Sequence, residues 1–190
     1  MRVFINPGHA KNGVPDPGAC YGGLRESDIA ASVGERVETY LRKAGCETMR
    51  LQSHCLMHES PGYPSVTDAA NSWAADIFVS IHVNAGGGRG AECLVYDTGG
   101  EAEKLACCLM GEYIPAMRAF DEKFCDRGIL RRPSLAVLRA TQMPAALIEL
   151  GFIDSTDRFL LASAHDAMAR AIARGVTDYE NLCLAQGDKP

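Results

Sequence analysis

Residues 76–83 constrain the fold more than any other part of the sequence. They read Asp-Ile-Phe-Val-Ser-Ile-His-Val, a nearly continuous apolar run rich in β-branched side chains. A strand with water on one face alternates apolar and polar residues, whereas a parallel strand covered on both faces is apolar along its length. We therefore expect residues 76–83 to be a central strand of a covered sheet.

The rest of the chain alternates short β-rich runs with longer runs of helical spacing, as in an α/β domain with a largely parallel sheet. The expected strands are residues 3–5, 47–51, 76–83, 91–96, 135–138 and 145–148. The expected helices are residues 27–44, 65–75, 101–117 and 164–172, with Pro115 disturbing the third near its end. Residues 54–64, 85–90 and 121–132 are expected to be irregular.

Size and composition indicate one domain. The chain has 190 residues, of which 47% are hydrophobic, which is enough to bury one sizeable core. We expect a single α/β domain over residues 1–181, with a mixed, mostly parallel, twisted sheet and helices on both faces. Residues 182–190 are expected to be a C-terminal tail.

Charge and apolar patterning exclude several kinds of partner. The 19 basic and 24 acidic residues give a formal net charge of −5, so no broad positive surface is available for nucleic acid or an anionic membrane. No apolar run approaches the roughly 20 residues of a membrane span, and residues 1–7 are too short of apolar residues for a signal peptide. Eight cysteines without a Cys-x-x-Cys pair favour free thiols. We expect a monomer that is made in the cytoplasm.

Three apolar runs end at a residue that can bind a metal ion or move a proton. These residues are His9, His82 and Glu149. The carboxyl ends of parallel strands lie at one edge of a sheet, where open α/β folds place their sites. Two histidines and a carboxylate are therefore expected to converge at that edge.

Each of these residues also has a structural explanation. A single histidine at a strand end is more often a hydrogen-bonded structural residue than a metal ligand. Glu149 lies between Ile148 and Leu150, and because burial of an ionised carboxylate is costly, the alternative for it is a buried salt bridge. Glu26 stands just ahead of a helix, where the helix dipole and capping favour an acidic residue for local reasons alone.

As a set, the residues resemble the zinc-dependent N-acetylmuramoyl-L-alanine amidases (amidase 3 type) of bacterial autolysins and phage endolysins. The resemblance spans almost the whole chain, and several separated motifs in the same order are far more specific than any one of them. The motifs are Asn-Pro-Gly-His at 6–9, Asp-Pro-Gly-Ala at 16–19, Glu26 entering the first long helix, the run 76–85 with His82, Gly-Ala-Glu at 90–92, and Ala-Leu-Ile-Glu-Leu-Gly-Phe at 146–152.

The resemblance implies that His9, Glu26 and His82 bind Zn²⁺ and that Glu149 is the catalytic general acid/base. Three protein ligands leave a fourth zinc position for water, as in other catalytic zinc sites. The implied substrate is peptidoglycan, and the implied reaction is hydrolysis of the amide between N-acetylmuramic acid and L-alanine of the stem peptide. Such an enzyme lyses or remodels the cell wall, after release from the cell or as part of a larger exported protein.

The chain departs from the family pattern around the first histidine. Asn6 stands where an acidic residue is common, and Ala10 and Lys11 stand where glycines are usual. Neither change removes a ligand, but both alter the loop that carries His9 and the contacts that support it.

Other functions remain open on the sequence alone. A different metallohydrolase on the same scaffold, such as a peptidase of the stem peptide, and a wall-binding module without catalysis are the main rivals. His54 and His58 are a second candidate metal pair, although Pro61 and Pro64 follow too closely for a stable helix. A cysteine–histidine hydrolase is weaker still, because no cysteine lies in a motif that would activate its thiol.

Overall fold

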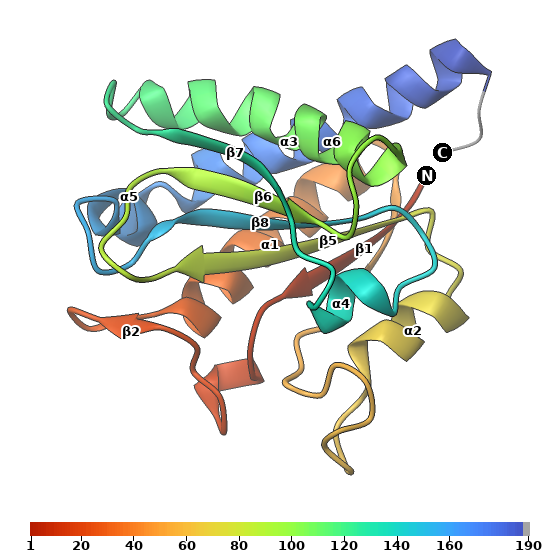
Figure 1. Cartoon of the computed structure of the whole chain (residues 1–190), viewed down its shortest axis with the longest axis horizontal. Coiled ribbons are helices and arrows are strands. Elements are labelled where there is room, and N and C mark those ends of the chain that lie inside the picture. The colour runs from red at the N-terminus through yellow and green to blue at the C-terminus, as the bar shows by residue number, and fades with distance from the viewer. Residues whose placement is uncertain (188–190) are drawn as a thin grey trace.

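A six-stranded sheet forms the centre of the protein in a computed structural model that describes residues 1–187 (Figure 1). Its strand order is β4-β1-β5-β8-β6-β7. Strands β4, β1, β5 and β8 run parallel, whereas β6 is antiparallel to β8 and parallel to β7. The strands are β1 Arg2–Pro7, β4 Glu47–Arg50, β5 Ile77–Asn84, β6 Ala91–Val95, β7 Asp126–Arg131 and β8 Ala145–Phe152.

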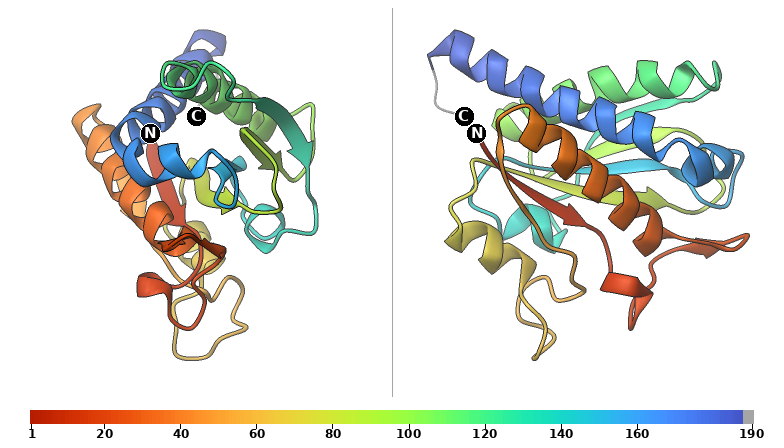
Figure 2. Two further views of the ribbon diagram at one scale, coloured as in Figure 1. Left: turned by 90° about the vertical axis from the view of Figure 1, so that its left-hand side faces the viewer. Right: turned by 180° about the vertical axis from the view of Figure 1, so that it is seen from behind.

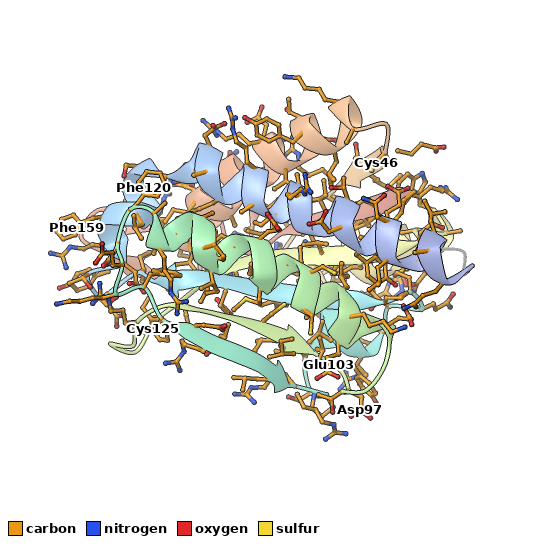
Figure 3. All side chains as sticks on the ribbon, turned by 90° about the horizontal axis from the view of Figure 1, so that it is seen from above. Cys46, Asp97, Glu103, Phe120, Cys125 and Phe159 are labelled. Carbon is orange, nitrogen blue, oxygen red and sulfur yellow. The ribbon has the colours of Figure 1, made fainter. Side chains whose placement is uncertain are left out.

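Three long helices cover one face of the sheet. They are α1 Glu26–Lys43, α3 Glu101–Arg118 and α6 His165–Gln186. Seen from above, α6 lies between the other two and contacts both (Figure 3). Val79 and Ile81 of β5 are fully buried in the core beneath these helices. The expected central position of this strand is confirmed.

The opposite face carries two short helices, α2 Val66–Ser72 and α4 Ala136–Arg139, below the sheet in Figure 1 and separate from the long helices in Figure 2. They pack on a second apolar cluster that includes Phe4, Phe78 and Leu147. Both helices lie toward the end where β1 begins, so within residues 1–187 no helix covers the carboxyl ends of β1, β5 and β8 on this face (Figure 1).

The remaining elements are small. The hairpin strands β2 Cys20–Tyr21 and β3 Leu24–Arg25 stand apart from the main sheet. The 3-10 helix η1 Lys11–Gly13 follows β1, and α5 Arg158–Ser163 precedes α6. No helix within residues 1–187 is long and apolar enough to cross a membrane. The single α/β domain with a mixed, mostly parallel sheet and helices on both faces is confirmed.

Three sequence-based predictions of secondary structure are wrong. Residues 135–138, expected as a strand, largely form α4, because so short an apolar run fixes no period. Residues 121–132, expected as a loop, contain β7, an edge strand whose exposure permits charged residues. The expected tail boundary at residue 182 falls inside α6, which is longer than predicted and buries Cys183. Residues 188–190 of that tail lie outside the described residues.

Tyr113 ties α3 to β8 beside the position of Glu149. Its buried hydroxyl donates a hydrogen bond to the Leu150 carbonyl at 2.9 Å. We expect Tyr113→Phe to lower the free energy of unfolding by about 1–2 kcal/mol, because that carbonyl would lose its partner inside the core. Urea denaturation measures the loss.

Tyr40→Phe is the matched control for this prediction. The Tyr40 hydroxyl donates to Asp166 at the surface, where water can replace it. Its removal is expected to cost less than about 0.5 kcal/mol. Equal losses in the two variants would contradict a special role for the buried hydroxyl.

Candidate metal centre

His9, Glu26 and His82 come from three different elements and meet at one point. His9 follows β1, His82 lies on the adjacent strand β5, and Glu26 is the first residue of α1. One ligand atom from each residue lies within 4.8 Å of the other two. Among residues 1–187, this is the only such group of three or more histidine, cysteine or acidic side chains.

The Glu26 carboxylate bridges the two histidines. Its Oε2 lies 2.9 Å from His9 Nε2, and its Oε1 lies 2.9 Å from His82 Nδ1. The backbone N–H groups of Ala19 and Val83 each donate to one of these oxygens at 2.9 Å. Burial alone would raise the pKa of Glu26, but the hydrogen bonds with His82 and His9 outweigh it and hold the pKa well below its usual range. The site therefore contains a buried, ionised carboxylate.

Asp16 fixes the orientation of the His9 ring. Its Oδ2 lies 2.7 Å from His9 Nδ1, and its Oδ1 accepts a hydrogen bond from the Gly18 N–H at 3.0 Å. This contact turns His9 Nε2 toward Glu26. Burial lowers the pKa of His9, but Glu26 and Asp16 together raise it to about 9. Two carboxylates thus favour a positive charge at this ring, and a bound metal ion would supply that charge.

Two glycines allow the backbone to approach these rings. A Cβ atom on Gly8 would lie 2.4 Å from Cε1 of His82. A Cβ atom on Gly18, whose φ is +66°, would lie 2.5 Å from Cδ2 of His9 and 2.6 Å from Oε2 of Glu26. Real Cβ contacts are not so short, so any larger residue at either position displaces one of the candidate ligand side chains.

Glu149 lies next to this group on the sheet. It pairs directly with His82 across β5 and β8, so both side chains point to the face without the long helices. Its Oε2 is buried and has no hydrogen-bond partner within residues 1–187. Burial raises the pKa of Glu149 to about 7. A carboxyl group with this pKa can both accept and donate a proton near neutral pH.

A cavity of about 140 Å³ opens beside the metal group on the same face. Its walls come from the two histidines, from the segment after β4 and from the start of α4. The lining residues include His9, His82, Ser53, His54, Leu56, Ala136 and Val137. This mixture of polar and apolar side chains can accept part of a ligand next to the histidines.

Asn6, the first departure from the family pattern, is a buried structural residue. Its Nδ2 donates to the Leu51 carbonyl at 3.0 Å, and its Oδ1 accepts from Ser80 Oγ at 2.9 Å. The side chain thus joins β1 to β5 and to the segment after β4. An aspartate could not donate to Leu51, so this contact depends on the amide.

The structure supports neither the second candidate metal pair nor a cysteine–histidine hydrolase. His58 pairs with Asp68 at 2.5 Å on the surface, whereas the His54 ring contacts Tyr63, and the two histidines join no three-ligand group within residues 1–187. Among the same residues, no hydrogen bond joins a cysteine to a histidine. Burial raises the thiol pKa of Cys93 above its ordinary value, the opposite of what a nucleophile needs.

The sequence analysis included Glu92 in a family motif without giving it a role, and it did not single out Arg127. Glu92 of β6 pairs with Glu149 across the sheet and accepts hydrogen bonds from Asn84 Nδ2 at 3.0 Å and Arg127 Nε at 2.6 Å. Glu92 interrupts an apolar run, so the reasoning applied to Glu149 could have identified it. No comparable signal existed for Arg127, which lies in a segment expected to be a loop.

Comparisons with known proteins agree on one family. Residues 3–178 match the N-acetylmuramoyl-L-alanine amidase family. The chain is 36% identical over 189 residues to a sporulation-specific N-acetylmuramoyl-L-alanine amidase of Bacillus subtilis, covering 96% of this chain and 69% of that protein. It is 37% identical over 176 residues to the amidase CwlM of Bacillus licheniformis, covering 92% and 65%. This chain therefore spans about two thirds of the length of these relatives.

Solved structures lead to the same conclusion. The amidase AmiC2 of Nostoc punctiforme superposes with a TM-score of 0.78 at 31% identity, and the match covers 95% of this chain and 97% of that one. The matched region includes both histidines, Glu26 and Glu149. The chain therefore belongs to the N-acetylmuramoyl-L-alanine amidases, a metal-dependent family of peptidoglycan hydrolases.

Proposed function

We propose that His9, Glu26 and His82 of this amidase hold a zinc ion and that Glu149 is its general acid/base. The observation that carries the proposal is the pairing of Glu149 with His82 on adjacent strands. It sets a carboxyl group, whose buried Oε2 has no hydrogen-bond partner in residues 1–187, beside the convergent ligand atoms. The substrate would be the amide between N-acetylmuramic acid and L-alanine.

The donor set fits zinc. Two imidazole nitrogens and one carboxylate oxygen are a common catalytic zinc set, which leaves one position open. Asp16 behind His9 supplies the carboxylate–histidine contact that orients metal ligands in other proteins. Bound zinc would polarise the scissile carbonyl and lower the pKa of a water molecule.

A side chain of the protein would then transfer the proton. Glu149 would take a proton from the attacking water and deliver it to the leaving amine of L-alanine. Its pKa of about 7 suits both halves of this transfer. The cavity beside the histidines would hold the groups that flank the scissile amide. Because peptidoglycan lies outside the membrane, the enzyme would act after release from the cell or as part of a larger exported protein.

Replacement of Glu149 distinguishes the role of a general acid/base from that of a metal ligand. We expect Glu149→Gln to lower amidase activity at least about 100-fold, because general acid/base catalysis is lost. Zinc content should stay at the wild-type level. The measurements are release of L-alanine amino termini from purified peptidoglycan and elemental analysis. Normal cutting by this variant would eliminate Glu149 as the acid/base.

The product also distinguishes an amidase from a peptidase on the same scaffold. Only an amidase frees the lactyl carboxylate of muramic acid together with an N-terminal L-alanine. Identification of the new termini by mass spectrometry therefore tests the bond that is cut. Termini at another residue of the stem would support the peptidase.

Removal of the metal should abolish activity reversibly. We expect about one zinc ion per chain, loss of cutting after treatment with a chelator, and recovery on addition of zinc. His82→Ala should retain little zinc and little activity, since only two ligands remain. A wild-type protein that cuts peptidoglycan without any metal would contradict the assignment.

Asp16 should affect the metal through His9. Because loss of such a supporting contact commonly weakens metal affinity, we expect Asp16→Asn to raise the dissociation constant for zinc about 10–100-fold. Competition with a coloured chelator measures this constant. Asp28→Asn is the matched control, since Asp28 pairs with Arg25 on the surface and should leave zinc affinity unchanged. Equal effects in the two variants would indicate a general charge effect.

A further inference from the structure

A row of polar side chains continues beyond Glu149, away from the metal centre. Glu149 of β8 pairs with His82 of β5 on one side and with Glu92 of β6 on the other, so all three point to the same face. Arg127 of the edge strand β7 joins the row through its hydrogen bond to Glu92. The row therefore leads from the candidate metal ligands to a cation at the edge of the sheet.

The position of Glu149 gives the direction in which the substrate would lie. This step rests on the proposed function, in which Glu149 protonates the leaving amine and the metal polarises the carbonyl. The amine then lies on the β8 side of the scissile bond. The stem peptide, which begins at this amine, would continue over β6 and β7 toward Arg127.

Distances along this path suit the second residue of the stem. Adjacent strands are about 4.8 Å apart, so β7 lies roughly 10 Å beyond β8. An extended peptide advances about 3.3–3.6 Å per residue, and Arg127 reaches back to Glu92 on the intervening strand. The second residue of the stem, an isoglutamate, carries a free α-carboxylate because the chain continues through its side chain.

Two contacts hold the Arg127 side chain in place, and its remaining N–H groups can donate to a ligand. Its Nε contacts Glu92, and its guanidinium lies 4.9 Å from the centre of the Phe152 ring. The side chain is 40% exposed, against 8% for Glu92. Within residues 1–187, its other N–H groups have no protein acceptor. Each Glu92 oxygen accepts one hydrogen bond, from Asn84 and from Arg127, so Glu92 positions these two side chains.

We propose that Arg127 is a specificity-determining residue that binds the α-carboxylate of the isoglutamate at the second position of the stem peptide. The planar guanidinium suits a carboxylate, since it can donate two parallel hydrogen bonds. The enzyme would therefore prefer stems with a free carboxylate over stems in which this group is amidated.

The test uses two synthetic muramyl peptides of full stem length that differ only in this group, isoglutamate against isoglutamine. We expect the wild type to favour the acidic peptide roughly tenfold in kcat/KM, mainly through KM. Arg127→Gln should abolish the preference, and Arg127→Lys should retain part of it. Arg131→Gln is the control, because Arg131 lies on the same strand but pairs with Asp97, and it should keep the wild-type preference.

The ratio of the two substrates separates recognition from a structural role. If Arg127 only neutralises Glu92, Arg127→Gln will slow both peptides equally and leave the ratio unchanged, which overturns the inference. Equal cutting of both peptides by the wild type overturns it too, with the proposed function intact. The Glu149→Gln protein should show the same tenfold preference in Kd by calorimetry. If the wild type cuts neither peptide nor peptidoglycan, the proposed function itself fails.

Discussion

The Glu26 carboxylate is the interaction on which the arrangement of the site depends. It is buried, ionised and held by two imidazole nitrogens and two backbone N–H groups. A buried charge is costly unless such partners compensate for it, so the end of β1, the end of β5 and the start of α1 must meet correctly. The same contacts that stabilise the carboxylate bring the candidate metal ligands together.

Because successive side chains of a strand point to opposite faces, β5 contributes to the core on one face and to the site on the other. Val79 and Ile81 point to the long helices, while Phe78 and His82 point to the other face. Toward the start of the strand that face is covered by short helices, and toward its end it carries polar side chains. A nearly continuous apolar run with a histidine close to its end is the sequence signature of this arrangement.

The sequence analysis identified the site residues that lie at strand ends, but it missed those whose role depends on tertiary contacts. His9, His82 and Glu149 stood out because each ends an apolar run, and the structure places all three at one edge. Glu26 had no local signal beyond helix capping, and only the family resemblance assigned it to the site. Asp16 contacts His9 within the connection that follows β1, and Arg127 contacts Glu92 on the neighbouring strand, so no helix or strand period reveals either contact. The secondary-structure prediction failed at β7, a largely exposed edge strand, and at α4, a four-residue helix that packs on the core, because tertiary contacts outweigh local propensity there.

The reversed direction of β6 and β7 divides the site into two parts with different constraints. Their first residues, rather than their last, lie at the edge that holds the candidate metal ligands, so residues 85–90 and 119–125 flank this edge. These connections contain none of the three ligands. During evolution, insertions or exchanges in them can reshape the surface over which the stem peptide would extend while the candidate catalytic residues stay in place. Relatives with the same chemistry can in this way diverge toward walls of different composition.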